Sequence, residues 1–231
     1  MQAVILAAGR GKRMGDLTND TPKPMLQIHG RPILEYTLLN LPQEITEVII
    51  IVGYNGEKIK EYFGEKFRGR KIRYAWQQRL DGTAGALFQV RKMLKGRFLV
   101  LNGDDFYHSE DLTRAIRHDF CILAKEVDDP GKFGVMELDE QDHLVRIIER
   151  PEKPPTNLVN IGAYSLDKRI FYYEPVAINE REFGLPQTMV QMARNHKIKV
   201  EKAKFWHPCN TREDVERAKE GLKQFIKVFK L

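Results

Sequence analysis

The stretch LAAGRGKRMGDLTNDTPKPML, residues 6–26, is a glycine-rich and strongly basic loop that follows an apolar run. Small residues at its start let backbone N–H groups approach an anion closely. Two prolines restrict the backbone around one of its cations, which limits the entropy lost when that side chain binds a target. The small residues are Ala7, Ala8, Gly9 and Gly11, the cations are Lys12, Arg13 and Lys23, and the prolines are Pro22 and Pro24. The stretch therefore predicts a site for a polyanion such as a chain of phosphates.

The spacing of the glycines excludes the two most familiar phosphate loops. Gly9, Gly11 and Gly15 form G-x-G-x-x-x-G, which is one residue too long for the dinucleotide fingerprint. Asn-Asp and two prolines follow within residues 19–24, so no helix can begin directly after the loop. The pattern G-x-x-x-x-G-K-[ST] of the nucleoside triphosphatases is also absent. The loop must hold its phosphates in another way.

Strand and helix patterns alternate along the first half of the chain. The apolar runs at 3–6 and 47–53 lack polar alternation, as strands buried on both faces do. Further strands are expected at 71–76 and 97–104, with helices over 32–40, beginning at Pro32, over 55–66 and over 83–94. This order predicts an α/β fold with a doubly wound, mostly parallel, Rossmann-like sheet and helices on both of its faces.

The second half of the chain has strand patterns mostly without long helices between them. These patterns lie at 120–127, 134–139, 145–150 and 160–166. They predict a small additional antiparallel part around a pocket. Because the chain has no repeat, low-complexity tract or linker, residues 1–231 are expected to form one domain.

Composition narrows the classes of partner. No stretch approaches the roughly 18 apolar residues that a membrane span needs, and no signal peptide is visible, so no membrane is expected. Cys121 and Cys209 lack metal-type spacing, which indicates a reducing compartment and a cytoplasmic protein. The net charge of +6 suits a small polyanionic substrate as well as a nucleic acid. No interleaved aromatic residues accompany it, so no nucleic acid is expected as a partner.

The lysine-rich segment after Thr211 carries part of this charge and predicts an amphipathic helix. Thr211 and Asp214 have the spacing of a capping box at its start. Its lysines are expected to form a solvated face, because the apolar residues fall on one stripe. That stripe consists of Val215, Ala218, Leu222, Phe225, Ile226 and Phe229.

The loop and several later segments together resemble the sugar-1-phosphate nucleotidyltransferase family, also called nucleoside-diphospho-sugar pyrophosphorylases. The family pattern L-A-[AG]-G-x-G-[ST]-R-[ML], then P-K-x-[ML], then G-[RK]-P-[IM]-[IL] corresponds here to LAAGRGKRM, TPKPML and GRPIL. Agreement continues in order through QQRLDGTAGAL at 77–87, LNGDD at 101–105, FGV at 133–135, IIERPEKP at 147–154, NIGAYSL at 160–166 and FWHPCNTREDVERA at 205–218. The resemblance implies that a nucleoside triphosphate, UTP or dTTP, reacts with a sugar 1-phosphate and releases pyrophosphate.

The resemblance also implies catalytic roles in the first loop. Arg13 would hold the β- and γ-phosphates and the leaving pyrophosphate, and Lys23 would bridge the α-phosphate and the sugar phosphate. Asp104 follows Gly103 at the end of an apolar strand, where a carboxylate suits Mg²⁺ as cofactor. Asp105 is a candidate to support it. The alternative for both carboxylates is capping of a helix near Ser109.

The second metal ligand departs from the family pattern. Many members end with W-x-D-[IV]-[GD]-T-x-E-D, whereas WHPCNTRED places Pro208 at the first Asp position. Proline has no side-chain ligand. Some relatives, the N-acetylglucosamine 1-phosphate uridylyltransferases, use an Asn in this region, so Asn210 is the candidate through its amide oxygen. The alternative is that Asn210 only caps the following helix beside Thr211.

Two further groups of residues match family positions. For the nucleotide these are Leu6, Ala7, Ala8, Gly9, Gly11, Gln77, Asp81 and Gly82, with Gln78 as the alternative to Gln77. A glutamine amide both donates to and accepts from a pyrimidine edge, which suits it to this role. For the sugar phosphate they are Gly134, Glu149, Arg150 and Asn160. Arg150 stands where family members usually have Lys. Tyr164 is expected either to pack in the core or to contact the sugar.

Other functions remain open at this stage. A cytidylyltransferase for inositol phosphate or phosphocholine shares the compact NTRED ending. A catalytically silent nucleotide-sugar sensor is favoured by Pro208 and disfavoured by the presence of Arg13, Lys23 and Asp104. The chain ends soon after its last helix pattern, so no acyltransferase or β-helical extension is expected. The base, the sugar and the oligomeric state are not determined by the sequence.

Overall fold

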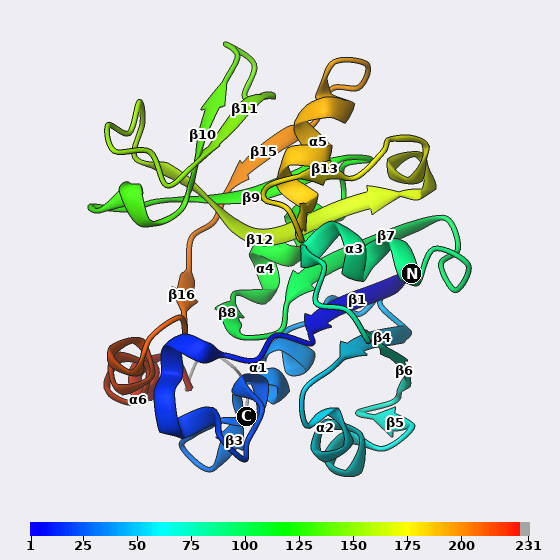
Figure 1. Ribbon diagram of the computed structural model, residues 1–231, viewed down its shortest axis with the longest axis vertical. Coiled ribbons are helices and arrows are strands. Elements are labelled where there is room, and N and C mark those ends of the chain that lie inside the picture. The colour runs from blue at the N-terminus through cyan, green and yellow to red at the C-terminus, as the bar shows by residue number, and fades with distance from the viewer. Residues whose placement is uncertain (227–231) are drawn as a thin grey trace.

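A computed structural model describes residues 1–226, apart from the side chains of Lys12 and of residues 222–226. Four strands at its centre run parallel in the order β7-β1-β4-β6 (Figure 1). They are β1 (Gln2–Ala7), β4 (Glu47–Val52), β6 (Arg70–Trp76) and β7 (Arg97–Asn102). The predicted parallel sheet is confirmed.

The second half of the chain extends this sheet with mostly antiparallel strands, as predicted. The long strand β12 (Leu158–Asp167) lies antiparallel to β7 and connects the two halves. The others are β9 (Cys121–Glu126), β10 (Gly134–Leu138), β11 (Leu144–Glu149) and β15 (Lys199–Lys202). Only β15 runs parallel to its partner, β9, among these added strands. With β5 (Lys66–Phe67) at the far edge, the sheet has ten strands in the described part of the chain.

Alternate residues of each central strand face opposite layers of helices. In β1, Ile5 packs with α1 (Ile33–Leu39), α2 (Gly56–Phe63) and α4 (Ser109–Ala115). Its neighbour Val4 packs with α3 (Gly82–Gln89) and α5 (Leu185–Ala193) on the other face (Figure 1). A strand covered on both faces needs apolar residues throughout, which explains the unbroken runs of β1 and β4.

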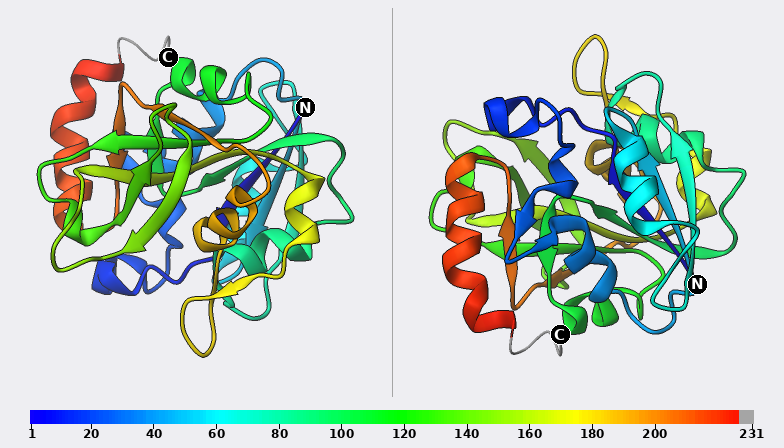
Figure 2. Two further views of the ribbon diagram at one scale, coloured as in Figure 1. Left: turned by 90° about the horizontal axis from the view of Figure 1, so that it is seen from above. Right: turned by 90° about the horizontal axis from the view of Figure 1, so that it is seen from below.

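The remaining helix, α6 (Arg212–Ile226), runs beside the loop that follows β1 (Figure 2). Val215 and Ala218 are buried with Met14 of that loop and Ile28 of β2, so the described part of the predicted apolar stripe is buried. The other four members of the stripe, Leu222, Phe225, Ile226 and Phe229, lie outside the described side chains. None of the helices within residues 1–226 has the length and apolar character that crossing a bilayer requires.

Several predicted boundaries were wrong. The helix expected over 83–94 ends at Gln89, because from Val90 the backbone amides bond to carbonyls three residues back. Pro32 belongs to β3 with an extended backbone, so α1 begins one residue later. The strand expected over 97–104 ends at Asn102, and the chain turns there into β8 (Asp105–Tyr107).

The helix α5 and the strand β15 were not predicted. Leu185, Met189 and Met192 are fully buried and have the helical i, i+4, i+7 spacing, so the signal for α5 was present. The short elements, which carry little pattern, are β2 (Gln27–Ile28), β3 (Arg31–Pro32), β13 (Val176–Ala177), β14 (Phe183–Gly184), β16 (Trp206–Pro208) and the 3₁₀ turns η1 (Lys12–Thr18), η2 (Lys23–Met25), η3 (Pro130–Lys132) and η4 (Lys168–Tyr172).

Candidate active site

The loop after β1 folds back on itself next to Lys23. Gly11 has a left-handed backbone with φ 64°. A Cβ atom at Gly11 would lie 3.1 Å from the Cβ atom of Lys23 and 3.1 Å from the Cγ2 atom of Thr18. The Thr18 hydroxyl also donates a hydrogen bond of 3.1 Å to the Gly11 carbonyl. Glycine is required here, because it alone tolerates both this backbone and this close approach without strain.

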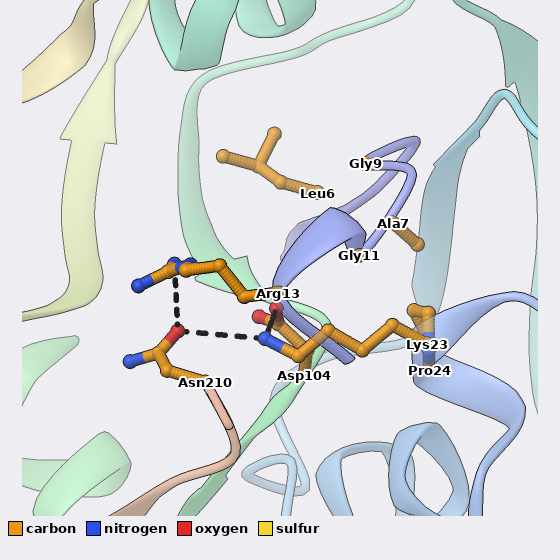
Figure 3. Close-up of a pocket in the computed structure, with 9 residues that line it drawn as sticks. All are labelled: Leu6, Ala7, Gly9, Gly11, Arg13, Lys23, Pro24, Asp104 and Asn210. Atoms are coloured by element: carbon orange, nitrogen blue, oxygen red, sulfur yellow. Dashed lines mark hydrogen bonds and ion pairs between the residues drawn. The ribbon is translucent and has the colours of Figure 1, made fainter. Parts of the chain in front are cut away.

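A cavity of about 230 Å³ opens beside this loop at the carboxyl edge of the sheet (Figure 3). Its wall joins the loop to the turn after β7 and to the segment between β16 and α6. The lining residues are Leu6, Ala7, Gly9, Gly11, Arg13, Lys23, Pro24, Asp104 and Asn210. The four polar side chains predicted for the phosphates and the metal therefore meet in one place.

Lys23 lies at the centre of this polar group. Its side chain is 7% exposed, and its Nζ atom lies 2.5 Å from Oδ2 of Asp104. Burial lowers the pKa of Lys23, but the negative charges of Asp104 and Asp105 outweigh burial and raise the pKa above its usual value. Pro22 and Pro24 flank Lys23, which begins η2. The ammonium group is thus charged and held in place.

Arg13 and Asn210 complete the chain of contacts that Figure 3 shows. A guanidinium nitrogen of Arg13 donates to Oδ1 of Asn210 over 3.3 Å, and Lys23 donates to the same oxygen over 3.4 Å. Oδ1 of Asn210 and Oδ2 of Asp104 both accept a hydrogen bond from the Nζ atom of Lys23. The two oxygens therefore converge on one position, which the Lys23 ammonium group occupies.

This pair of oxygens fits Mg²⁺ as a cofactor. Magnesium in phosphate sites takes one or two protein oxygens and completes its shell with phosphate oxygens and water. Within the described residues there is no group of three or more His, Cys, Asp or Glu side chains that could hold a metal by themselves. A site that binds its metal together with a phosphorylated ligand is consistent with both observations.

Asn210 is not the cap of α6, so that alternative is wrong. The predicted capping box is present: the Asp214 amide donates to Oγ1 of Thr211 over 3.2 Å, and the Thr211 amide donates to Oδ2 of Asp214 over 2.8 Å. The Asn210 amide also donates to Asp214 Oδ2, over 2.9 Å. The cap thereby fixes the Asn210 backbone and leaves its side chain pointing into the cavity.

Asp105 lies behind Asp104 and is 3% exposed. Its Oδ1 accepts a long hydrogen bond of 3.4 Å from the Cys209 amide, one residue before Asn210. Burial, together with the charge of Asp104, raises the pKa of Asp105 to about 7. Neither carboxylate caps α4, because the N-cap residue of that helix is His108. The position of Asp105 links the turn after β7 to the segment that carries Asn210.

A larger cavity of about 790 Å³ adjoins the first and contains the predicted base site. Gln77 lines it and is 9% exposed, whereas Gln78 is exposed and is not in its wall, so Gln77 remains the candidate to contact the base. Asp81 is not in the cavity wall, and its Oδ1 accepts from Gln77 Nε2 over 2.7 Å. Asp81 therefore orients Gln77. The predicted nucleotide residues in this wall are Leu6, Ala8, Gly9, Gly11, Gln77 and Gly82.

Three of the four predicted sugar-phosphate residues lie together. Gly134 pairs with Glu149 across β10 and β11, and a Cβ atom at Gly134 would lie 3.1 Å from Glu149 Oε2 and 3.9 Å from Asn160 Cβ. Arg150 lines a third cavity, of about 930 Å³, which adjoins the first because Arg13 and Asn210 border both. The Nε atom of Arg150 lies 3.8 Å from Oε1 of Glu149, so Arg150 borders this cavity and also contacts the cluster of the other three.

Tyr164 packs in the core. It is 2% exposed, and its hydroxyl accepts a hydrogen bond of 2.9 Å from Asn160 Nδ2. The packing interpretation of Tyr164 therefore holds, with the added effect that Tyr164 orients the Asn160 amide.

Three residues in the wall of the larger cavity were not predicted from the sequence. Asn179, Arg181 and Glu182, at the tip of the β13–β14 hairpin, line this cavity. The hairpin is fixed there by a hydrogen bond of 2.8 Å from the Phe183 amide to the Asp81 carbonyl. No local pattern reports a contact across about a hundred residues. Arg10, in the first loop, also lines the cavity and was not predicted to contribute.

The fold is of the α/β class in which ligands bind at the carboxyl edge of a parallel sheet, and a cavity with four polar side chains lies at that edge here. Residues 2–208 match the family model described as Nucleotidyl transferase. The chain therefore belongs to the nucleotidyl transferase family, as the resemblance indicated.

Two curated relatives and one solved structure illustrate the match. The bifunctional protein GlmU of Methanocaldococcus jannaschii is 34% identical over 225 residues, which cover 96% of this chain and 54% of that protein. The D-glycero-alpha-D-manno-heptose 1-phosphate guanylyltransferase of Campylobacter jejuni is 38% identical over 174 residues, which cover 74% of this chain and 78% of that protein. The chain thus spans about half the length of its GlmU relatives. The inositol-1-phosphate CTP transferase of T. maritima has the same fold, with a TM-score of 0.81, 19% identity and 98% and 96% of the two chains covered.

Proposed function

We propose that this protein is a nucleotidyltransferase that joins a nucleoside triphosphate, UTP or dTTP, to a sugar 1-phosphate and releases pyrophosphate. The observation that carries the proposal is the convergence of Arg13, Lys23, Asp104 and Asn210 in one cavity at the carboxyl edge of the sheet. The family, and the guanylyltransferase relative that acts on a sugar 1-phosphate, support it.

The reaction needs positioning and charge neutralisation rather than a protein nucleophile. An oxygen of the sugar phosphate forms a bond to the α-phosphorus. The bond from that phosphorus to the bridging oxygen breaks, and pyrophosphate leaves with the electron pair. Lys23, charged and buried, stabilises the negative charge that grows between the α-phosphate and the sugar phosphate. Arg13 holds the leaving pyrophosphate.

Asp104 and Asn210 are the residues that would hold Mg²⁺. When bound, Mg²⁺ neutralises phosphate charge in this family of reactions. A neutral amide attracts a cation less than a carboxylate does, so this pair predicts weaker metal binding than two aspartates. The backbone of the loop from Leu6 to Gly11 supplies N–H groups to the phosphates in addition.

The two sides of the site select the substrates. On one side Gln77, fixed by Asp81, presents its amide to the edge of the base. For the sugar, Glu149 would accept hydrogen bonds from hydroxyl groups, and Gly134 lies directly beside it on the neighbouring strand. Asn160 is held by Tyr164 beside them.

The experiment is a pyrophosphate-release assay with purified protein. UTP, dTTP, CTP, GTP and ATP are each combined with a panel of sugar 1-phosphates and Mg²⁺, and the products are identified by mass. We expect pyrophosphate release with UTP or dTTP, and loss of release in the variant Lys23→Met. The control variant is Arg91→Met, because Arg91 is an exposed residue in the turn after α3. No release from any pair would refute the proposal.

Two other functions are separate outcomes of the same assay. Release from CTP with inositol phosphate or phosphocholine would identify a cytidylyltransferase. Binding of a nucleoside triphosphate by calorimetry, without release from any pair, would identify a silent sensor. The second is less supported, because the Asn210 amide lines the cavity with Asp104 and could serve as the ligand that Pro208 lacks.

A further inference from the structure

Arg10 occupies the variable position between the two loop glycines and faces the larger cavity. It lines that cavity with Gly9, Arg13 and Asp104. Its guanidinium carbon lies 5.2 Å from the centre of the Tyr54 ring. Among the side chains that the structure describes, no carboxylate pairs with Arg10, so its charge is available to a ligand.

The positive charge of the described side chains in the small cavity is smaller than the negative charge of the proposed substrates. Lys23 is paired with Asp104, and Asn210 is neutral, so Arg13 is the one uncompensated cation among the described residues of the small cavity. A nucleoside triphosphate carries about four negative charges and a sugar phosphate nearly two. Even with one Mg²⁺, the positive charge falls short of the phosphate charge that must gather there.

We propose that Arg10 is a further phosphate-binding residue, which contacts the β- and γ-phosphates of the nucleoside triphosphate, and that Tyr54 is its positioning residue. The proposal rests on the proposed function for the identity of the ligand. A cation–π contact at an exposed position is weaker than a charge-assisted hydrogen bond to phosphate. The ring contact uses the face of the guanidinium and leaves the N–H groups at its edge free, so Arg10 can donate to the phosphates while the Tyr54 ring holds it.

Tyr54 is hydrogen-bonded to the loop that carries Arg10. Its hydroxyl donates to the carbonyl of Asn19, at the far end of the loop. Two residues that follow Tyr54 also bond to the loop. Asn55 Nδ2 donates to the Asp20 carbonyl over 3.1 Å, and Lys58 Nζ donates to the same carbonyl over 2.5 Å. These bonds fix the ring relative to the loop, so Arg10 loses less freedom when a phosphate binds.

The start of the loop is fixed to this turn as well. A Cβ atom at Gly53 would lie 2.7 Å from the carbonyl oxygen of Ala8, so the two backbones are in direct contact. The turn after β4 therefore touches both ends of the phosphate loop, and the Tyr54 ring lies beside Arg10 between them.

The test measures binding of inorganic tripolyphosphate by calorimetry, with and without Mg²⁺. For Arg10→Met we expect affinity about tenfold weaker, the loss of one charge-assisted contact. Arg10→Lys should recover part of the loss, and the control Arg91→Met should bind like the wild type. Thermal unfolding of each variant confirms that the protein is folded.

The proposal is overturned if Arg10→Met binds tripolyphosphate like the wild type, or if the wild type does not bind it at all. This assay needs no acceptor and no turnover. A protein that binds tripolyphosphate through Arg10 but releases no pyrophosphate in the activity panel would therefore refute the proposed function and leave the role of Arg10 intact.

The role of Tyr54 has its own readout. Tyr54→Phe keeps the ring and should retain most of the affinity, whereas Tyr54→Leu should lose affinity toward the level of Arg10→Met. In the double variant with Arg10→Met, the Leu substitution should add little, because the two residues act through one contact. Fully additive losses would show that Tyr54 does not act through Arg10.

Discussion

The Nζ atom of Lys23 lies 2.5 Å from Oδ2 of Asp104, although the two residues are 81 positions apart. The contact joins the loop after β1 to the turn after β7, two strands that are neighbours in the sheet. In the proposed reaction the same two groups serve different partners, since Lys23 binds phosphate and Asp104 binds Mg²⁺. The ion pair thus keeps both charges compensated until the substrates arrive.

Replacing Lys23 tests its role in turnover. Lys23→Met should lower kcat by about 10²–10³-fold, the usual loss for one preorganised donor. Lys23→Arg should not restore it, because a planar guanidinium does not fit where the ammonium is 7% exposed. The assay is initial-rate pyrophosphate release, with the exposed Lys60→Met on α2 as control. Full activity of Lys23→Arg would contradict this account.

Changing Asn210 tests its role as a metal ligand. Asn210→Asp adds a charged oxygen and should lower the Mg²⁺ concentration for half-maximal activity, whereas Asn210→Ala should raise it. Asn195→Ala, outside the site, is the control. The measurement is a Mg²⁺ titration at saturating substrates. An unchanged Mg²⁺ requirement in both Asn210 variants would exclude Asn210 as a ligand.

Gly11 and Gly96 form a matched pair for the effect of the loop backbone. Both have a positive φ, but a Cβ atom at Gly96 would meet nothing within 4 Å. Alanine at Gly96 should lower the free energy of unfolding by about 1 kcal/mol. Alanine at Gly11 should lower it at least as much, because its Cβ atom also crowds Lys23 and Thr18. Only Gly11→Ala should also reduce activity, because its Cβ atom displaces Lys23. Denaturant unfolding and initial rates separate the two effects, and equal activity losses would mean that crowding of Lys23 is unimportant.

Asp167 and Arg169 predict a pH dependence of stability. Burial raises the pKa of Asp167, but hydrogen bonds from Arg169 outweigh burial, so the pKa lies below its ordinary value of 3.8. A carboxylate with a depressed pKa stabilises the fold above its unfolded pKa and loses that contribution as the pH falls through the folded pKa.

The wild type should therefore be more stable than Asp167→Asn near neutral pH, by about 1 kcal/mol or less because Arg169 is partly exposed. The difference should shrink as the pH falls below about 4. Urea unfolding over a pH series measures it, with the exposed Glu140→Gln as control. A difference that grows toward acid pH would have the wrong sign.

The parts of the fold that sequence predicts are those whose cause is local. Unbroken apolar runs identify β1 and β4, because both faces of these strands are covered, and Thr211 with Asp214 identifies the start of α6. The position of the β13–β14 hairpin depends on Phe183 bonding to Asp81, so no nearby residue reports it. In the same way, motif matching identifies Lys23 and Asp104 but does not reveal their contact.

Arg13 and Asn210 are 197 positions apart, and their contact has a consequence for synthesis of the protein. A nascent chain can form its parallel strands while still attached to the ribosome, but it lacks Asn210 until that residue has emerged from the exit tunnel. A chain cut between β15 and α6 is expected to lose the Asn210 amide, the proposed metal ligand, although all four central parallel strands precede the cut. Proteolysis in this segment is therefore expected to reduce the proposed activity without removing any strand of the ten-stranded sheet.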